Sequence, residues 1–364
     1  MSPVLALSAA VVGVVLIGGT ILSAVRTMVL PRSARSMLTS LTFLSSRKLF
    51  GFIAKPGEFA RTDRIMALFA PLTLLALAAV WLTLVLIGFT LLFWAAGYGS
   101  WVEAVWASGS SLFTLGSASL GETGHRLLAF SEAAIGLGLV ALLISFLPSL
   151  YAAFSRREQL VALLEVRAGS PPTAVEMLER FERIGWSESL SAEWDRWETW
   201  FVDIDESHTS YPALVWLRSP QPERSWITAA GTVLDAAALL LSVVDRPREP
   251  APALCIRAGF IALRRIADFF GIPFDPDPDP ADPISISRSE FDAAVEHLIG
   301  VGVPVVADRD QAWADYAGWR VNYDAVLLSI SELVAAPFAP WTSDRSAPDH
   351  ARPRVTRWGG REKG

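Results

Sequence analysis

Residues 107–124 read ASGSSLFTLGSASLGETG, a run of small and mostly uncharged residues between two long apolar segments. A short polar turn would be enough to reverse the chain between two membrane helices. The preceding stretch, WVEAVWASGSSLF at 101–113, predicts a helix that is too short to cross a bilayer. A short helix followed by extended backbone is tolerated at membrane depth only where protein or water surrounds it. The interval therefore predicts a pore loop, with a short helix at 101–113 and an extended small-residue segment at 114–119.

The composition indicates a membrane part followed by a water-soluble part. The chain has 364 residues, a mean hydropathy of +0.38 and 19% charged residues. Residues 1–155 carry nine Lys or Arg against five Asp or Glu, whereas residues 156–364 carry 22 against 32. The acidity of the second part argues against a nucleic-acid partner. The single cysteine, Cys255, can form no intramolecular disulfide.

Three segments are long and apolar enough to span a bilayer: residues 1–25, 65–96 and 127–154. The first has no basic residues before it, which favours a transmembrane helix over a cleaved signal peptide. We accordingly expect an N-terminal transmembrane helix in 1–30, a basic cytoplasmic loop at 31–64 and a pore domain at 65–155. The pore domain would contain an outer helix at 65–96 and an inner helix at 127–154.

The orientation follows from the basic residues. The loop between the first two spans has eight Lys or Arg and two acids, and Arg156 and Arg157 follow the third span. The positive-inside rule places both in the cytoplasm and the N-terminus outside. Trp94, Tyr98 and Trp101 fall where an outer aromatic belt would lie. Arginine far outnumbers lysine, as in GC-rich bacteria, so we expect a multi-pass protein of a bacterial plasma membrane in contact with membrane lipids.

The order of span, short helix, small-residue segment and span resembles the potassium channel family with two helices and a pore loop per subunit, the bacterial kind in particular. In that family the pore helix ends in T-V-G-Y-G-D. Thr114, Leu115 and Gly116 match the first three filter positions. SRREQL at 155–160 is similar to the charged exit of the family's inner helix. The resemblance covers residues 65–165, under a third of the chain.

The resemblance implies a homotetrameric cation channel, in which carbonyl oxygens from four loops replace the hydration shell of a monovalent cation such as K⁺. It implies no catalysis, no cofactor and no bound metal centre. Glu122 would form an outer ring that attracts cations, or be a solvated loop residue. Gly136 and Gly138 would let the inner helix bend. The ion filter would be lined by Thr114, Leu115, Gly116, Ser117 and Ala118.

Two filter positions differ from the family. Ser117 replaces the tyrosine and Ala118 replaces the second glycine, and an alanine held at positive φ costs about 1–2 kcal/mol. The pore would then be wider and poorly selective, or the scaffold would persist without conduction. A further alternative is a filter that lies a few residues downstream, toward Gly121 and Gly124. The alternative function is a non-conducting, membrane-anchored sensor or interaction protein that acts through its cytoplasmic domain.

Residues 156–338 predict an all-helical cytoplasmic domain. Apolar residues at helical spacing, such as Trp194, Trp197 and Phe201, indicate core packing. Residues 226–245 are apolar enough for a fourth span, but Asp235 at their centre favours a buried helix, because a carboxylate inside a bilayer is costly. Residues 339–364 are Pro- and Arg-rich, which is typical of a disordered basic tail.

Neither a nucleotide-binding glycine motif nor a hydrolase motif occurs in this domain. The stretch DIDESHTSYPALVWLRSP at 203–220 brings acids close to His208, which would suit a metal or ligand site. The competing interpretation is a helix end whose backbone groups are satisfied by polar side chains. Residues 274–283, FDPDPDPADP, predict an extended loop because proline recurs at every second residue.

Overall fold

The computed structural model describes residues 2–30, 36–53, 59–185, 189–247 and 249–351. Within these ranges the protein is helical, without a β-strand and with one isolated antiparallel bridge between Val244 and Val305. The predicted all-helical fold is confirmed. The chain forms two compact units, and each is described here by itself. Unit 1 is Met1–Ala54 with Leu68–Ala152, and unit 2 is Lys55–Ala67 with Ala153–Gly364.

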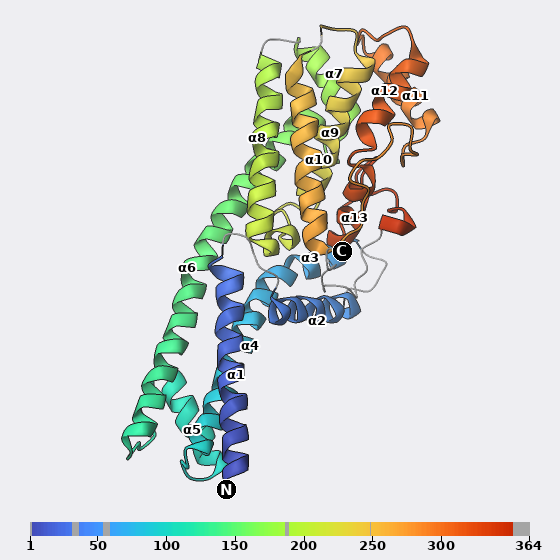
Figure 1. Ribbon diagram of the computed structural model, residues 1–364. Helices are drawn as coiled ribbons and strands as arrows, with labels where there is room; N and C mark the ends of the chain where they lie inside the picture. Colours follow the sequence, from blue (N-terminus) through green and yellow to red (C-terminus); the bar gives the residue numbers. More distant parts are fainter. Residues whose placement is uncertain (1, 31–35, 54–58, 186–188, 248, 352–364) are drawn as a thin grey trace. The chain divides into compact units, whose positions relative to one another are not determined.

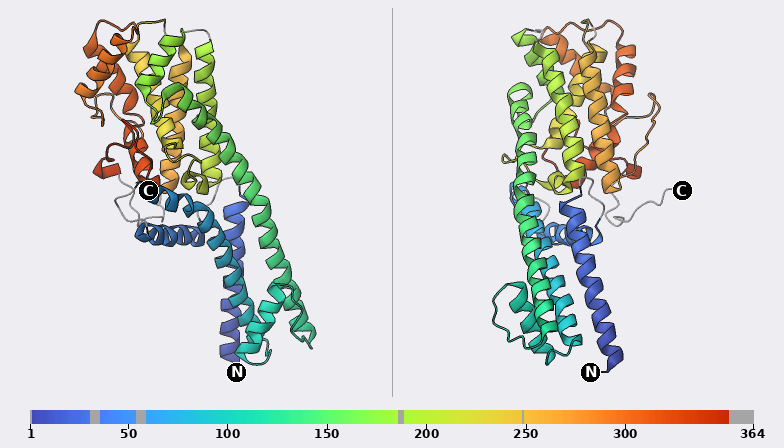
Figure 2. Two further views of the ribbon diagram at one scale, coloured as in Figure 1. Left: turned by 180° about the vertical axis from the view of Figure 1, so that it is seen from behind. Right: turned by 60° about the vertical axis from the view of Figure 1, so that its left-hand side comes forward.

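Unit 1 is built around two long apolar helices that pack along each other, as Figures 1 and 2 show for the blue and cyan ribbons. Small residues set their distance: a Cβ atom on Gly13 would lie 2.7 Å from the carbonyl oxygen of Gly88. Glycine lets membrane helices approach closely enough for dispersion contacts. The helices of unit 1 are α1 (Pro3–Met28), α2 (Met37–Ile53), α4 (Phe69–Ala95), α5 (Trp101–Leu112) and the first part of α6 (Thr123–Ala168).

A buried polar contact also joins α1 to α4. The indole nitrogen of Trp81 donates a hydrogen bond of 3.1 Å to the hydroxyl of Ser23, which lies 2.7 Å from that of Ser36. Buried hydroxyls and indoles need such partners. The predicted basic loop at 31–64 contains the helix α2, whose Phe43 and Phe50 rings contact Phe69 at the start of α4.

Unit 2 is a bundle in which the apolar helix α9 (Trp226–Val243) is enclosed by its neighbours. Figure 1 shows α10 next to α8, and α9 contacts α10, α7, α12 and α13. The predicted core residues Trp194, Trp197 and Phe201 are buried. The other helices of unit 2 are α3 (Phe59–Ala67), the end of α6, α7 (Ala174–Ile184), α8 (Ser189–Ser210), η1 (Pro212–Trp216), α10 (Pro250–Phe270), α11 (Arg288–Gly300), α12 (Arg309–Arg320), α13 (Asp324–Val334) and η2 (Asp349–Ala351).

Among the described residues, four helices are long and apolar enough to cross a membrane: α1, α4 and α6, which match the three predicted spans, and α9, which the sequence predicts as a buried helix despite its apolar length. They differ in their surroundings. The apolar 18-residue stretch is 22% buried in α1, 39% in α4 and 22% in α6, but 89% in α9. The first three therefore present apolar surface, while α9 has protein on nearly every side.

A buried ion cluster explains the acid in α9. The guanidinium of Arg320 is fully buried and donates to Asp235, to Asp324 at 2.7 Å and to the carbonyl oxygen of Trp341 at 2.6 Å. Tyr323 donates to the same oxygen of Asp235 at 2.8 Å. A buried charge is tolerated when it is paired and hydrogen-bonded in this way.

Two segments that were not predicted as part of the helical C-terminal domain also belong to unit 2: α3 and residues 339–351. Asp63 on α3 accepts a hydrogen bond from Arg218, and both side chains are largely buried. Residues 339–351 were expected to begin a disordered tail, but Ala339, Thr342 and Ala347 are buried and Arg345 pairs with Glu290 on α11. The Trp341 ring also contacts Tyr316, and the backbone N–H of Ala347 donates to Glu332 at 2.8 Å. Residues 352–364 of the predicted tail lie outside the described residues.

Candidate functional site: the loop between α4 and α6

The short helix of the loop, α5, covers 101–112, where the sequence predicts 101–113. Its start is fixed by a capping box: Ser100 accepts from the backbone N–H of Glu103, and the Glu103 carboxylate accepts from the backbone N–H of Ser100 at 2.5 Å. This pair satisfies two N–H groups that would otherwise have no helical partner. The helix has 12 residues, about 18 Å in length at 1.5 Å per residue, and is too short to cross a bilayer.

Contacts on two sides hold α5 in unit 1. The hydroxyl oxygen of Ser108 lies 2.9 Å from the carbonyl oxygen of Leu86 on α4. At the other end, Leu112 packs on Gly136 of α6, where an added Cβ would lie 2.8 Å from the leucine side chain and 3.0 Å from its carbonyl oxygen. Gly136 therefore makes room for the end of α5. Gly138 has no atom within 4 Å of its Cβ position.

The backbone turns sharply directly after α5. Thr114 and Gly116 have φ values of 54° and 66°, in the left-handed region, while Ala118 is not among the described residues with positive φ. Ala118 therefore does not bear the strain that the family's filter conformation would impose on it, and the left-handed non-glycine residue of the turn is Thr114. Ser110 holds the turn, since its hydroxyl accepts from the backbone N–H groups of Ser117 at 2.9 Å and Ala118 at 3.2 Å.

The predicted filter residues lie together on this turn. Thr114, Leu115, Gly116 and Ser117 are exposed in the single chain and Ala118 is half-buried. Leu115 is 69% exposed, which is unusual for a leucine and leaves apolar surface at the tip. The threonine hydroxyl donates to the carbonyl oxygen of Phe113 at 2.7 Å. The arrangement supplies backbone carbonyl groups, one hydroxyl and no charge.

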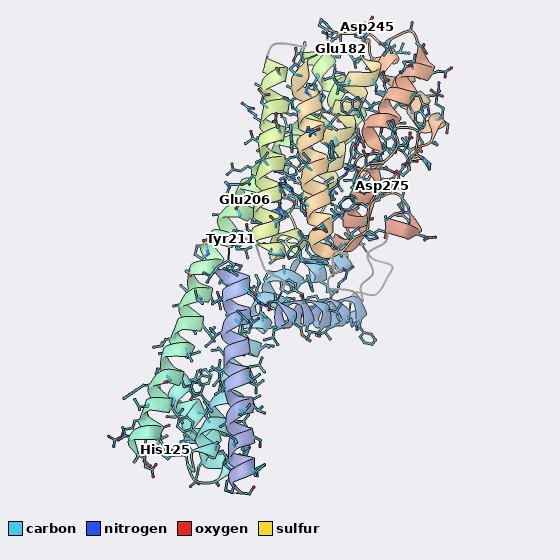
Figure 3. All side chains as sticks on the ribbon, viewed as in Figure 1. His125, Glu182, Glu206, Tyr211, Asp245 and Asp275 are labelled. Atoms are coloured by element: carbon cyan, nitrogen blue, oxygen red, sulfur yellow. The ribbon has the colours of Figure 1, made fainter. Side chains whose placement is uncertain are left out.

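The segment between the turn and α6 is held by hydrogen bonds to its backbone from residues next to α4 and on α6. Tyr98 donates to the carbonyl oxygen of Ser119 at 3.2 Å, and Arg126 donates to that of Leu120 at 2.9 Å. His125, labelled in Figure 3 at the start of α6, lies 3.2 Å from the carbonyl oxygen of Ala96. Glu122, the predicted outer-ring acid, is exposed and lies 3.9 Å from the His125 ring.

A buried acid on α6 contacts the short helix α5. Glu132 on α6 is fully buried, and one carboxylate oxygen accepts a hydrogen bond of 2.6 Å from Ser108 on α5. The other oxygen has no hydrogen-bond partner among the described residues. The sequence interpretation gave no role to Ser108, Ser110 or Glu132. The signal that could have found the last is a lone acid in an apolar span, which marks a functional position by default.

The helix α6, at the position of the predicted inner helix, continues without interruption from Thr123 to Ala168, well beyond the predicted end at 154. Pro148 lies inside it and cannot donate the helical hydrogen bond at its position, so the helix has a local weak point there. Arg157 on the same helix is buried in unit 2, where its guanidinium donates to the carbonyl oxygens of Leu214 at 2.7 Å and Leu217 at 2.6 Å.

The acid-rich stretch at 203–208 forms partnered contacts and not a metal site. Asp203 pairs with Arg156 at 3.1 Å, Asp205 pairs with Arg265, and Figure 3 shows Glu206 on the same helix, α8. His208 is fully buried beside Arg157, and this burial, with the arginine's charge, holds the pKa of the imidazole well below its usual value. Across the described part of the chain, no group of three potential ligands is placed to hold a metal ion.

The fold and the composition define the described part of the chain as all-helical, and its apolar helices suggest a multi-pass membrane protein. Comparisons with protein-family models, curated proteins and solved structures give no significant match.

Proposed function

We propose that the protein is a tetrameric, potassium-channel-like cation channel of the plasma membrane, with an atypical filter formed by residues 114–118. Four copies around one axis would bring together the exposed turns that follow α5. Carbonyl groups from Thr114 to Ala118, with the Thr114 hydroxyl, would replace water around a monovalent cation.

The observation that carries the proposal is the packing of α5 between α4 and α6, followed by a turn with left-handed backbone at Thr114 and Gly116. Residues in the left-handed region allow successive carbonyl groups to point in one direction. The exposed apolar tip at Phe113 and Leu115 would be covered by neighbouring copies.

The proposed topology has three crossings, α1, α4 and α6, with the N-terminus outside and unit 2 in the cytoplasm. The burial of α9 supports its assignment as a core helix. The pair Asp63–Arg218 supports a common side for the basic segment before α4 and the C-terminal bundle, because both residues belong to unit 2. The excess of basic residues in that segment favours the cytoplasmic side.

The test is reconstitution of the purified protein into planar bilayers. We expect cation-selective currents that disappear in Gly116→Asp, because four carboxylates would crowd the narrowest part of the path. Gly51→Asp on α2 is the matched control, since its position lies outside the loop between α4 and α6 and has no atom within 4 Å of the Cβ site. Silent bilayers that contain verified tetramers of the unaltered protein would refute conduction.

The second candidate is a non-conducting, membrane-anchored sensor that acts through unit 2. The observation that favours it is a cavity of about 400 Å³ in unit 2 with a buried carboxylate in its wall. That volume lies within the range of small-molecule sites. A ligand-binding unit without conduction would fit this candidate.

A further inference from the structure

Three oxygen atoms from three helices of unit 1 meet at Ser108. The hydroxyl oxygen of Ser108 on α5 lies 2.6 Å from Oε1 of Glu132 on α6 and 2.9 Å from the carbonyl oxygen of Leu86 on α4. Both distances lie in the range of O–H···O hydrogen bonds. The serine therefore connects α5 to both neighbouring helices.

The two contacts require two hydrogens, and Ser108 has one. A hydroxyl group donates a single hydrogen and accepts through its lone pairs. The carbonyl group of Leu86 is an acceptor only, and so is an ionised carboxylate. With Glu132 ionised, one of the two contacts would therefore place two oxygen atoms against each other without a hydrogen between them. The second hydrogen can come only from the carboxyl group of Glu132.

The other carboxyl oxygen indicates the same protonation. Oε2 of Glu132 is buried and has no hydrogen-bond partner among the described residues. In a carboxylate this atom would bear half of the negative charge, and a charged acceptor without a donor is strongly unfavourable away from water. In a neutral carboxylic acid it is an ordinary carbonyl oxygen. Glu132 is fully buried in the single chain, so its isolation from water depends neither on lipid nor on neighbouring copies.

Among the described residues, no cation lies where it could neutralise Glu132. The helix α4 has no ionisable residue, and α5 has only Glu103, which caps its first turn. On α6, His125 and Arg126 lie about two turns before Glu132, and both contact backbone carbonyl oxygens instead. The helix α1, which packs along α4, has only Arg26, in its last turn. An ionised Glu132 would thus be a buried charge without a counter-charge.

We infer that Glu132 is a proton-binding site, whose carboxyl group holds a proton at neutral pH and donates it in a hydrogen bond to Ser108. Ser108 in turn donates to Leu86, so two hydrogen bonds in series join α6 through α5 to α4. Loss of the proton would direct the serine hydrogen to Glu132 and leave the contact with Leu86 without one. Proton binding thereby decides whether α5 is bonded to α4 at this point. The inference does not depend on conduction, since it needs only contacts within unit 1.

The experiment is infrared difference spectroscopy of the full chain in lipid vesicles at neutral pH, with the wild type compared with Glu132→Gln. A protonated carboxyl group has a C=O stretching band that is separate from the carboxylate bands. We expect Glu132→Gln to remove a protonated band. Glu296→Gln, at an exposed acid on α11, should remove only carboxylate bands. All other acids, including Asp235, are the same in the compared proteins and cancel. Loss of a carboxylate band in Glu132→Gln would show an ionised acid and overturn the inference.

Ser108→Ala tests the direction of the hydrogen bond, and it replaces the first variant if Glu132→Gln does not fold. The carboxyl group would keep its proton but lose its acceptor, so the protonated band should move to higher frequency and remain as intense. Ser111→Ala is the control, because the Ser111 hydroxyl donates within α5, to the carbonyl oxygen of Ala107. A change confined to the carboxylate bands in Ser108→Ala would overturn the inference.

The unfolding temperature in detergent gives an independent measurement. The amide of Glu132→Gln donates to Ser108 as a protonated carboxyl group does, so this variant should be at least as stable as the wild type at neutral pH. As the pH rises, the wild type should lose stability relative to the variant, because its folded state holds a proton that the unfolded chain releases. A variant that is less stable than the wild type by the same amount at every pH would contradict a bound proton.

Discussion

The hydroxyl of Ser108 on α5 lies 2.6 Å from a carboxylate oxygen of Glu132 on α6, and both side chains are buried. This contact joins α5 to α6, and Ser108 lies two residues before Ser110, the serine that holds the turn after α5. Any displacement of α6 at this level would therefore act on the base of the loop through a hydrogen bond.

Removal of that hydroxyl should be costly. In Ser108→Ala, both carboxylate oxygens of Glu132 would lack a protein donor among the described residues, and a buried polar group without a partner costs about 1–3 kcal/mol. We expect a lower unfolding temperature in detergent. Ser111→Ala is the control, because Ser111 bonds only within its own helix, to the carbonyl oxygen of Ala107. An equal loss of stability in both variants would contradict a special role for the Ser108 contact.

The two glycines of α6 should respond differently to alanine. A Cβ at position 136 would overlap Leu112, so Gly136→Ala should destabilise unit 1 by about 1–3 kcal/mol. Gly138→Ala meets no atom and should be neutral or stabilising by up to about 1 kcal/mol, because alanine favours helix. Thermal unfolding of both variants measures this difference. If Gly138→Ala abolished currents without loss of stability, the bend predicted there would be supported.

The filter-like turn should depend on Gly116 and not on position 118. Gly116 has a φ of 66°, so Gly116→Ala should cost about 1–2 kcal/mol per chain through backbone strain alone, as no atom lies near its Cβ site. Ala118→Gly should change stability little, since Ala118 does not occupy the left-handed region. Unfolding temperatures of the purified variants would show the difference. A large gain in stability from Ala118→Gly would indicate that this residue is strained after all.

Acid should weaken unit 2 through Glu290. The pKa of this carboxyl lies at about 2, below its ordinary value of 4.5. A lowered folded-state pKa contributes stability that is fully present above pH 4.5 and is lost as the pH falls toward 2. We expect Glu290→Gln to lower stability at neutral pH and to flatten this pH dependence, as followed by urea unfolding between pH 2 and 7. Glu296→Gln, at an exposed acid on the same helix, should leave the dependence unchanged.

The ion pair between Asp63 and Arg218 should tie α3 to the bundle. A double-mutant cycle of Asp63→Ala and Arg218→Ala isolates their coupling from the other bonds of Arg218, which reach the carbonyl oxygens of Val334 and Ala335. For a largely buried pair in direct contact we expect a coupling of about 1–3 kcal/mol in the free energy of unfolding. Additive effects of the two substitutions would show that α3 is held by other contacts.

Prediction from the sequence was most successful for helix bounds, which the hydrophobic pattern alone determines. The bounds of the helices predicted at 65–96 and 101–113 agree with α4 and α5 to within four residues, because apolar length and a change to small residues mark their ends. It placed Asp235 in a buried helix on the cost of an acid in lipid, and the structure pairs that acid with Arg320. The partner itself, 85 residues away, could not be inferred from local pattern.

Other features depended on contacts that no local pattern encodes. The roles of Ser108 and Ser110 follow from the distances of their hydroxyls to groups that are remote in the sequence or on the next turn. The packing of residues 339–351 depends on pairs such as Arg345–Glu290, which composition cannot reveal. The positive φ of Thr114 was missed because a β-branched residue is a poor candidate for the left-handed region.

The discontinuity of unit 2 also bears on biosynthesis. Asp63 leaves the ribosome 155 residues before Arg218, its partner in the finished protein. At about 5–20 residues per second, the delay amounts to about 8–30 s, during which α4, α5 and α6 are synthesised. Completion of unit 2 therefore waits on the synthesis of the apolar helices that are encoded between its two parts.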